Sequence, residues 1–484
     1  MDTGKLLYCN PLSLPSIPLG SDGWEAMEEF TGESEREYRS VSDPSVRYFD
    51  GKWYMYPSYG MAWVSDDFRT WKHVRTEPYD MKYSPDVVFF RNKYYMTSHS
   101  NGLYVSDTPL GEFKYLGDFI MPDGSLFRPT DPCLFADDDG RLYMYAFTMR
   151  RDGPGSPFTT GTMGMELDGD DPRRIINGPE ILFEFDPANP WERFGEKRQD
   201  ARFGWIEGQW MLKRNGRYYL IYSSAGTQFT NYCMAAYYSD ECPLSGFKLQ
   251  KNNPVTESRS RLVSGAGHGS ITEGPNGTLW AFYTMSANIT HAFERLVGMD
   301  LIAVNGDGEL YAPHGITDSP QFAPGQASDP VLSNSPGLFS LTARQRTMSR
   351  ASSHIYGREP MYALDESLLT FWEPEHDDPA PCLTVNLQAQ YIISAARIIW
   401  YDVGLDSRKG ALRGPFRYKI ECASELCNPV WHSVVDATGN RDDLKVDFRQ
   451  FPETRTSAVR LTVTGHPHGV YPAVTDFSVF GIRE

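Results

Sequence analysis

The sequence predicts an all-β protein in which a five-bladed β-propeller is followed by a β-sandwich. One strand–turn–strand pattern recurs five times in the first two thirds of the chain, which is typical of propeller blades. Helical periodicity is scarce throughout. The strand spacing then changes after a segment rich in proline, glycine and serine. These observations predict a propeller over residues 1–315, a linker over 316–339 and a β-sandwich over 340–484.

Each copy of the pattern begins with an acidic or histidine-bearing segment and continues as an apolar strand. A turn through Asp, Asn or Gly then leads into a strand rich in aromatic residues. The copies span residues 42–56, 84–96, 130–144, 206–220 and 267–280. The first strand of a blade lines the central channel of a propeller. Because Asp43, Asp131 and Glu207 all lie at the start of such a strand, the sequence predicts that they converge on one pocket.

The residues after the linker form short strands at a different spacing. Strand-forming residues fill 382–387, 395–400, 416–420, 458–463 and 475–480, with turns between them. Short strands separated by turns are typical of a β-sandwich.

The charge balance excludes some classes of partner. The chain has 46 basic and 63 acidic residues among 484, a formal charge of −17, whereas nucleic acids and anionic membranes are bound through basic patches. Aromatic residues make up 14% of the chain, and Tyr and Trp can stack on sugar rings while keeping a polar group. The composition therefore favours a carbohydrate partner over a nucleic acid or a membrane, and it leaves the oligomeric state open.

The cysteines and the first residues bear on the cellular compartment. Seven scattered cysteines without paired metal-ligand spacing favour buried free thiols, with a local Cys422–Cys427 pair as the less favoured alternative. No apolar run is long enough to span a membrane. The first residues lack the regions of a signal peptide, which predicts either a cytoplasmic protein or a secreted one whose leader has been removed.

Hydrolysis of a glycosidic bond needs two carboxyl groups across the bond, one of which must be held protonated. Glu207 lies between Trp205-Ile206 and Gly208, an apolar setting expected to raise its pKa. Asp43 and Asp131 each precede a proline at a strand start. A single Asp-Pro pair often does no more than start a strand, but acidic residues at the same place in three blades favour a catalytic site.

Four motifs together resemble glycoside hydrolase family 43, whose members are five-bladed inverting glycosidases. The motifs are Ser42-Asp43-Pro44-Ser45, Thr130-Asp131-Pro132, Ile206-Glu207-Gly208 and the His268 segment 265–270, and the resemblance covers about residues 38–313. It implies that Asp43 is the general base that activates water and that Glu207 is the general acid. Asp131 is then expected to orient that acid and to adjust its pKa.

Four further residues are expected at the substrate pocket. Asp86 matches a carboxylate that borders the sugar, although it serves equally well as a plain strand start. Trp205, two residues before the expected acid, supplies an aromatic ring. His268 matches a channel histidine that binds calcium or orders the site, and Arg295 matches a sugar-binding arginine. The structural alternatives for these two are a core histidine and an ordinary surface salt bridge.

The region 340–484 resembles discoidin-like modules of the coagulation factor 5/8 type and family 32 carbohydrate-binding modules. The resemblance rests on residues 351–353, 363–372, 383–387 and 474–481. In such modules a loop between an Asp and a Trp, together with an acidic residue of the last strand, holds a structural calcium ion, which prefers oxygen ligands. Asp365, Thr370 and Asp476 are the candidate ligands, although Glu366 and Ser367 depart from the usual Asp-Gly-Asp.

These expectations combine into an inverting exo-glycosidase that removes terminal α-L-arabinofuranosyl or β-D-xylosyl units from plant polysaccharides or oligosaccharides. No cofactor is expected for catalysis, while calcium is a candidate structural ion in the propeller channel and in the C-terminal module. Two alternatives stay open. One is a β-galactosidase or galactofuranosidase on the same scaffold. The other is a non-catalytic carbohydrate-binding protein, which the presence of all three carboxylates disfavours.

Overall fold

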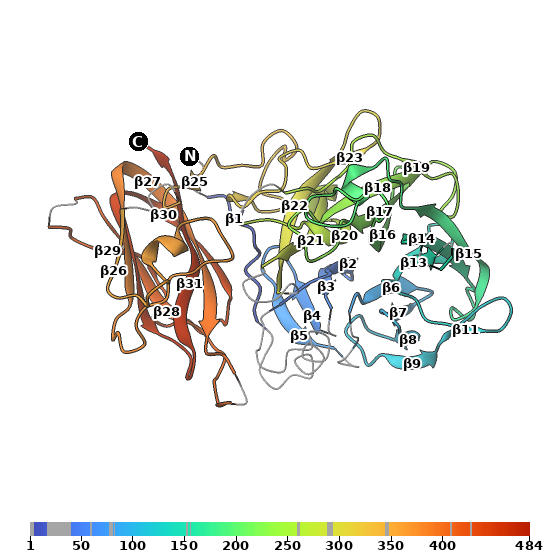
Figure 1. Ribbon diagram of the computed structural model, residues 1–484, viewed down its shortest axis with the longest axis horizontal. Helices are drawn as coiled ribbons and strands as arrows, with labels where there is room; N and C mark the ends of the chain where they lie inside the picture. Colours follow the sequence, from blue (N-terminus) through green and yellow to red (C-terminus); the bar gives the residue numbers. More distant parts are fainter. Residues whose placement is uncertain are drawn as a thin grey trace.

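A computed structural model of the protein describes residues 4–16, 40–58, 61–76, 81, 83–151, 153–154, 156–258, 262–287, 294–343, 348–406, 409–425 and 428–484. Helix is represented there by short 3₁₀ turns such as Pro190–Glu192, Pro275–Gly277 and Pro360–Ala363. A ring of five four-stranded sheets lies beside a unit of long antiparallel strands (Figure 1), which confirms the predicted fold class. Within these ranges, no helix is long and apolar enough to cross a membrane.

Each propeller blade is an antiparallel sheet of four strands that follow one another in sequence. The first two blades contain β2 (Ser45–Phe49), β3 (Lys52–Tyr56), β4 (Met61–Ser65) and β5 (Lys72–Arg75), then β6 (Asp86–Phe90), β7 (Lys93–Thr97), β8 (Leu103–Ser106) and β9 (Lys114–Gly117). The hairpin of β10 (Phe119–Ile120) and β11 (Leu126–Phe127) follows. The third blade contains β12 (Cys133–Ala136), β13 (Leu142–Arg151), β14 (Phe158–Leu167) and β15 (Ile175–Glu184). The last two contain β16 (Ile206–Arg214), β17 (Arg217–Ser224), β18 (Cys233–Ser239) and β19 (Lys248–Leu249), then β20 (Gly267–Glu273), β21 (Leu279–Ser286), β22 (Arg295–Val304) and β23 (Leu310–Tyr311).

Two-residue turns join the first and second strands of three blades. Asp50-Gly51, Arg91-Asn92 and Asn215-Gly216 have positive φ at both positions, the geometry of a type I′ turn, and the strands pair directly on either side. This turn matches the right-handed twist of the strands, so its residues fix the pairing register. The register in turn decides which side chains face the channel.

The first strands of the blades surround the propeller axis. β2 lies beside β6, β6 beside β12, β12 beside β16 and β16 beside β20, and β20 returns to β2. Side-chain hydrogen bonds help to close the ring, because Ser270 Oγ donates to the Pro44 carbonyl at 2.8 Å and accepts from the Val46 N–H at 3.0 Å. Strand β1 (Leu7–Tyr8) joins none of the blades and pairs with β24 (Gln321–Phe322).

The C-terminal unit is a set of seven strands in the order β25–β31–β27–β30–β28–β29, with β26 paired to β27. The strands are β25 (Phe339–Ser340), β26 (Ser349–Ala351), β27 (Cys382–Val403), β28 (Arg417–Ala423), β29 (His432–Asp436), β30 (Val446–Gly465) and β31 (Tyr471–Arg483). β27 pairs with β26 near its start and with β31 along its later part. Apolar side chains around Trp372, Trp400 and Phe477 fill the core of this sandwich.

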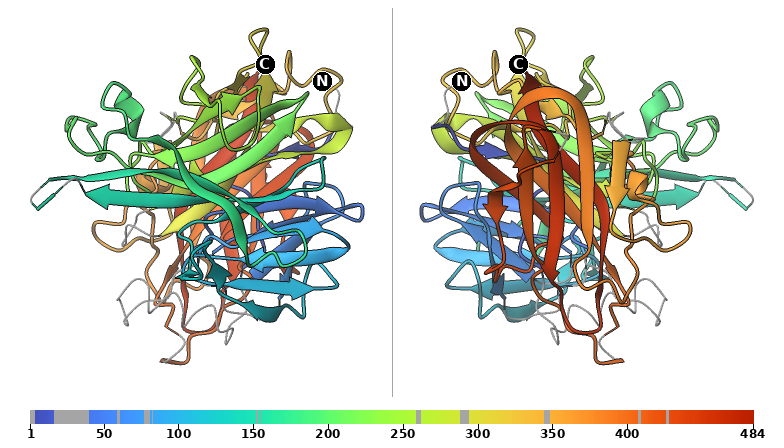
Figure 2. Two further views of the ribbon diagram at one scale, coloured as in Figure 1. Left: turned by 90° about the vertical axis from the view of Figure 1, so that its right-hand side faces the viewer. Right: turned by 90° about the vertical axis from the view of Figure 1, so that its left-hand side faces the viewer.

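The N-terminal segment 4–16 lies between the propeller and the sandwich (Figure 1). Leu7 and Cys9 share a hydrophobic cluster with Ala395 and Phe480 of the sandwich. The buried guanidinium of Arg397 donates to the carbonyl of Asn10, two residues after β1, at 2.5 Å. In the side views of Figure 2 the propeller and the sandwich lie one behind the other along the line of sight. The two units are therefore joined by apolar packing and by buried polar contacts.

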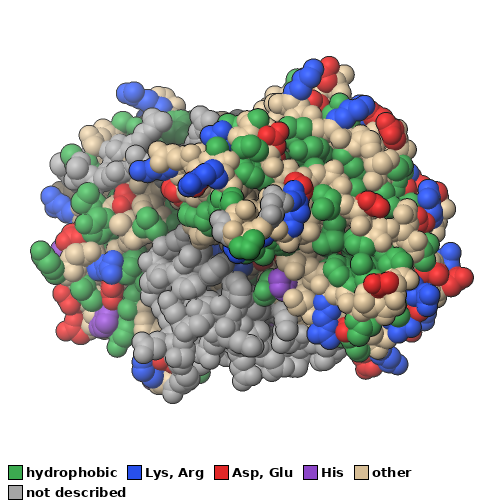
Figure 3. All heavy atoms as spheres, turned by 45° about the vertical axis from the view of Figure 1, so that its right-hand side comes forward, with side chains coloured by type: hydrophobic (Ala, Val, Ile, Leu, Met, Phe, Trp, Pro, Cys, Tyr) green, Lys and Arg blue, Asp and Glu red, His purple; other side chains and the backbone are tan. Residues whose placement is uncertain are grey.

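The structure shows how charged side chains are distributed on one face and which cysteines are free thiols. Figure 3 shows acidic and basic side chains interspersed over one face of the molecule, with hydrophobic side chains between them. Cys9, Cys133, Cys233, Cys242, Cys382 and Cys422 are free thiols. Cys427, the alternative partner of Cys422, lies outside the described residues.

Candidate active site

One backbone conformation recurs at the start of four blades. Asp43, Ser84, Asp131 and His268 have φ values of 54°, 53°, 47° and 36°, and each precedes a Pro or a Gly. Non-glycine residues in this left-handed region carry a conformational cost of about 1 kcal/mol or more, and they cluster at functional sites. All four residues line the same cavity. The shared turn therefore presents one side chain from each of these blades to a common space.

The fourth blade reaches the cavity in another way. Glu207 lies inside β16, where the pairing with β17 shifts between Glu207 and Trp210. The irregularity contains Gly208, whose φ is +61°, and a Cβ atom at that position would lie 2.8 Å from Cγ of the His268 ring. A β-bulge of this kind re-aims a side chain. The glycine after Glu207 is thus required both by its backbone angle and by the close approach of His268.

The cavity has a volume of about 270 Å³. The three carboxylates of Asp43, Asp131 and Glu207 line it, and the other lining residues are Tyr83, Ser84, Phe194, Trp205, Thr227, Gln228, His268 and Arg295. A larger cavity of about 550 Å³ lies between the sandwich and the segments that contain β1 and β24, but its lining contains one carboxylate, Glu453. The smaller cavity has the several carboxyl groups that acid–base hydrolysis requires.

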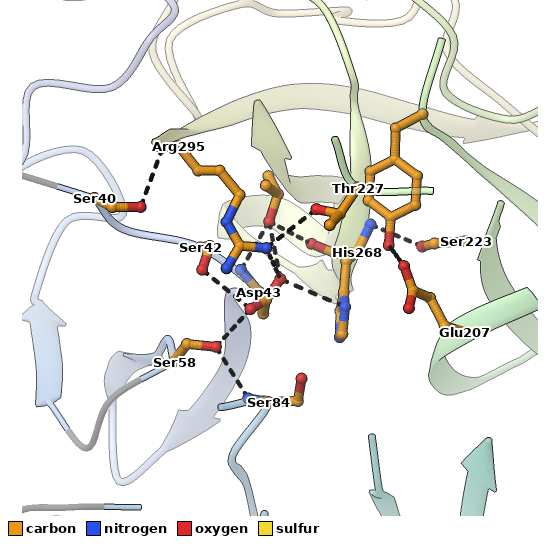
Figure 4. A network of polar contacts seen from close by, with 12 residues as sticks. Ser40, Ser42, Asp43, Ser58, Ser84, Glu207, Ser223, Thr227, His268 and Arg295 are labelled. Carbon is orange, nitrogen blue, oxygen red and sulfur yellow. Dashed lines mark hydrogen bonds and ion pairs between the residues drawn. The ribbon is translucent and has the colours of Figure 1, made fainter. Parts of the chain in front are cut away.

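Asp43 is surrounded by hydrogen-bond donors (Figure 4). Its Oδ2 accepts from Ser58 Oγ at 2.5 Å and from Ser42 Oγ at 3.0 Å, and its Oδ1 lies 3.3 Å from Arg295 Nη1. Burial alone raises the pKa of a carboxyl group. Arg295, His268 and the two serine hydroxyls outweigh burial here, so the pKa of Asp43 is lowered. Asp43 is therefore held ionised.

Glu207 has the opposite protonation behaviour. Burial raises its pKa, and the negative charge of Asp131 raises it further. Tyr232 Oη donates to Glu207 Oε1 at 2.6 Å and Trp205 Nε1 donates to Oε2 at 2.6 Å, and these bonds reduce the rise without reversing it. The net result is a carboxyl group that stays protonated at a higher pH than an ordinary glutamic acid.

Asp131 keeps its charge despite being buried. Burial raises its pKa, but the nearby His99 and His268 lower it more, so the pKa of Asp131 is lowered overall. His99 Nδ1 lies 3.6 Å from Asp131 Oδ1. An ionised Asp131 is the neighbour that raises the pKa of Glu207.

His268 and Arg295 contact Asp43 from the fifth blade. His268 Nδ1 lies 3.4 Å from Asp43 Oδ1, and the backbone N–H of His268 donates to Ser223 Oγ at 2.7 Å. Arg295 Nη1 also donates to Thr227 Oγ1 at 3.1 Å. The guanidinium therefore has a fixed orientation in the cavity wall, as Figure 4 shows.

Asp86 does not line the cavity, because Ser84 occupies the place that Asp43 and Asp131 occupy in their blades. Asp86 lies two residues further along, about one strand repeat (~6.6 Å) away from that place. Its Oδ2 is 2.7 Å from Arg47 Nη2 and accepts from the Leu134 N–H at 2.8 Å. The structure thus places Asp86 in a link among the first three blades, and its contact with a sugar stays a prediction.

The expected calcium ligands of the sandwich do not form a cation site. Asp476 Oδ2 is 3.0 Å from Arg397 Nε, with both side chains buried, and Asp365 Oδ2 accepts from Thr370 Oγ1 at 2.8 Å. Because the guanidinium already supplies positive charge to Asp476, this residue does not fit as a calcium ligand. In the described ranges no three His, Cys, Asp or Glu side chains are grouped as metal ligands. Calcium binding by His268 stays a prediction.

Sequence reasoning missed several residues around the carboxylates, among them Ser58, His99 and Tyr232. Ser58 and His99 each lie two residues after the second strand of a blade, which ends at Tyr56 in the first blade and at Thr97 in the second. A polar residue at this repeated place is a signal that could have identified both. Tyr232 comes from the loop before β18, where no motif marks it.

The site therefore combines a carboxyl group whose pKa is raised with a carboxyl group whose pKa is lowered, in a cavity that also contains an arginine and aromatic rings. This combination can give a proton to one atom of a bound molecule and remove a proton from a water molecule.

A family model described as Glycosyl hydrolases family 43 matches residues 22–310 of the chain. The curated "Xylosidase/arabinosidase 43A" of Humicola insolens is 26% identical, with 39% of this chain and 74% of the relative covered. "Beta-D-galactofuranosidase xynD" of Aspergillus niger is 22% identical, with 56% of this chain and 81% of the relative covered. A solved structure described as a thermostable family-43 glycoside hydrolase is 22% identical, with a TM-score of 0.50 over 66% of this chain and 100% of the other, a likeness in fold.

Proposed function

Since this chain belongs to glycosyl hydrolases family 43 and is therefore an inverting glycoside hydrolase, we propose that it removes terminal α-L-arabinofuranosyl or β-D-xylosyl units from plant polysaccharides or oligosaccharides. Glu207 acts as the general acid and Asp43 as the general base. The observation that carries this proposal is that two carboxyl groups of one cavity have pKa values displaced in opposite directions. An acid and a base that work at the same pH must differ in protonation state.

In this mechanism Asp43 takes a proton from a water molecule as the water oxygen attacks the anomeric carbon. Glu207 gives its proton to the departing glycosidic oxygen, and the bond between that oxygen and the anomeric carbon breaks. Attack and departure occur on opposite faces of the sugar, so the anomeric configuration inverts. Asp131 contributes through charge, because it keeps Glu207 protonated until the bond breaks.

Trp205, His268 and Arg295 hold the sugar unit in this proposal. All three line the cavity, and the Thr227 contact of Arg295 supports a fixed direction for its hydrogen bonds. A volume of about 270 Å³ lies at the lower end of the range for small-molecule pockets. This size favours a single terminal unit over an internal stretch of polysaccharide, and it supports exo cleavage.

The names of relatives guide the choice of sugar. The Humicola insolens relative is named a xylosidase/arabinosidase, which supports a pentose. A second candidate is hydrolysis of galactofuranosides, since the Aspergillus niger relative named a galactofuranosidase covers a larger share of this chain.

A panel of para-nitrophenyl glycosides tests the proposal. We expect hydrolysis of the α-L-arabinofuranoside, the β-D-xyloside or both, with proton NMR showing the inverted anomer as the first product. Asp43→Ala and Glu207→Ala from the same purification serve as controls against contaminating glycosidases. Turnover of the β-D-galactofuranoside alone would establish the second candidate, and equal turnover by wild type and Asp43→Ala would refute the role of Asp43.

A further inference from the structure

The contact between propeller and sandwich includes a buried ion pair close to the cavity. Lys445, the residue before β30, donates from Nζ to Glu294 Oε1 at 3.0 Å, and the two side chains are 8% and 3% exposed. Charges at this depth depend on each other, because removal of one partner leaves the other buried and uncompensated. The pair therefore fixes Glu294 relative to the sandwich.

Glu294 directly precedes Arg295 in sequence, at the start of β22. Successive side chains of an extended backbone point in opposite directions. Glu294 accordingly reaches Lys445 of the sandwich, while Arg295 lines the cavity and contacts Asp43. Leu296, on the same side as Glu294, borders the same small space as Lys445. One peptide unit thus separates a contact with the sandwich from a contact with the proposed base.

The backbone around Arg295 is held on the propeller side. The Ala287 N–H donates to the Glu294 carbonyl at 2.8 Å. The Arg295 N–H donates to Ser40 Oγ at 3.1 Å, and the Arg295 carbonyl accepts from the Val41 N–H at 3.1 Å. This region of the strand therefore moves together with the segment that leads to Asp43.

Lys445 is held equally firmly on the sandwich side. Its carbonyl accepts from the Trp400 N–H at 2.9 Å. The next residue, Val446, belongs to the hydrophobic cluster that also contains Leu296 of the propeller. Packed cores transmit displacements because they contain few voids. The position of Lys445 is therefore coupled to the position of the first residues of β22.

We propose that Lys445 of the sandwich is a positioning residue for the active site, which acts through Glu294 to hold Arg295 against Asp43. The sandwich then forms part of the structure that supports catalysis, whether or not it also binds carbohydrate. This inference deepens the proposed function, since it rests on the role of Asp43 as the base.

Two variants and one control separate positioning from stability. Lys445→Met removes the positive charge of this pair and leaves the buried carboxylate of Glu294 in place. Lys445→Met combined with Glu294→Gln removes both charges, a change that buried pairs often tolerate without loss of stability. The control is Arg397→Met, which removes another buried charge of the same interface. The contacts of Arg397 within the described ranges, such as Asp476 and the Asn10 carbonyl, lie outside the cavity lining.

The readouts are the melting temperature, kcat/KM against pH, and the titration of the Asp43 carboxyl group. The last uses carbon-13 NMR of aspartate-labelled protein, with Asp43→Asn to assign the signal. In the part of the chain that the structure describes, the charged or titratable groups around Asp43 are Arg295, His268, Asp131, Tyr83 and Tyr232. A loosened Arg295 stabilises ionised Asp43 less, so Asp43 must titrate at higher pH and the acid limb of the profile must move upward.

We expect both Lys445 variants to show this upward movement, with kcat/KM reduced by about tenfold or more as the geometry loosens. The double variant recovers the melting temperature of the wild type, and Arg397→Met loses stability without moving the limb. Recovery of both stability and the limb in the double variant would overturn the proposal, since the pair would then have only a structural role. If the wild type hydrolyses no glycoside, the proposed function fails, while the Asp43 titration still decides whether Lys445 positions Arg295.

Discussion

Asp43 and Glu207 line one cavity, yet their neighbours act on the two carboxyl groups in opposite directions. Asp43 is close to Arg295 and accepts two serine hydrogen bonds, whereas Glu207 is buried beside the charge of Asp131. The apolar residues beside Glu207 were enough to predict a raised pKa. They could not reveal that the indole N–H of Trp205 points at the carboxylate and opposes the rise, because that orientation depends on how the fourth blade folds.

Replacement of each carboxyl group should separate the acid from the base. Glu207→Ala removes the proposed proton donor, so we expect a loss of about 10²–10⁴-fold on natural oligosaccharides and a smaller loss on nitrophenyl glycosides, whose leaving group needs little protonation. Asp43→Ala removes the proposed general base and should reduce both activities similarly, with azide restoring turnover as the inverted glycosyl azide. Steady-state kinetics on both substrate types is the measurement. Equal leaving-group dependence in the two variants would contradict the assignment.

Two further substitutions should move the alkaline limb of the pH–rate profile in opposite directions. Asp131→Asn removes a negative neighbour, which lowers the pKa of Glu207 and moves the limb to lower pH. Tyr232→Phe removes a donor to the ionised carboxylate, which raises the pKa and moves the limb to higher pH. Asp137→Asn is the control, since Asp137 is buried against Lys213 away from the cavity. If the alkaline limb moved in the same direction in both variants, or moved in neither, the result would argue against these contacts.

At the scale of the elements, most of the site residues predicted from the sequence come from the repeated pattern at the start of each blade. The Asp-Pro pairs of Asp43 and Asp131 were identified because each lies two residues before its strand. Asp86 also adjoins a proline, but it follows that proline and lies inside β6, where it pairs with Arg47. Residues two positions apart lie on the same face of a strand. The composition of the motif therefore could not distinguish an acidic residue before the strand from one inside it.

The bulge at Gly208 should be intolerant of a side chain. Gly208→Ala places a Cβ atom 2.8 Å from the His268 ring at a φ of +61°, so we expect a stability loss above the ~1 kcal/mol of the backbone angle alone and about tenfold lower kcat/KM. Gly216→Ala is the matched control in the same blade, with a φ of +80° and no atom within 4 Å of the added Cβ. Urea unfolding and kinetics on both variants provide the comparison. Equal effects would show that the His268 contact carries no constraint.

At the scale of the whole molecule, the boundaries read from the sequence suggest two separable domains and a linker. The structure joins them through shared clusters, in which Leu368, Ile399 and Val446 of the sandwich pack with propeller residues such as Leu296. Contacts between residues far apart in sequence leave no local pattern, so the sequence could predict the two folds without predicting how strongly they are joined.

Calorimetry should therefore show one unfolding transition. Since the two units share buried apolar clusters and the Lys445–Glu294 pair, we expect a calorimetric enthalpy equal to the van't Hoff enthalpy for the whole chain. Far-ultraviolet circular dichroism and tryptophan fluorescence should follow the same curve. Two resolved transitions would show that propeller and sandwich unfold independently.

The position of segment 4–16 also determines when it can dock during synthesis. The Leu7 N–H donates to Gln450 Oε1, a residue made 443 positions later. Each blade consists of consecutive strands and can pair as it leaves the ribosome, but the segment around Leu7 must wait until Gln450 has emerged. Its apolar residues stay exposed to other chains and to chaperones during that interval. Docking of this segment onto the sandwich therefore follows the pairing of the strands in the five blades.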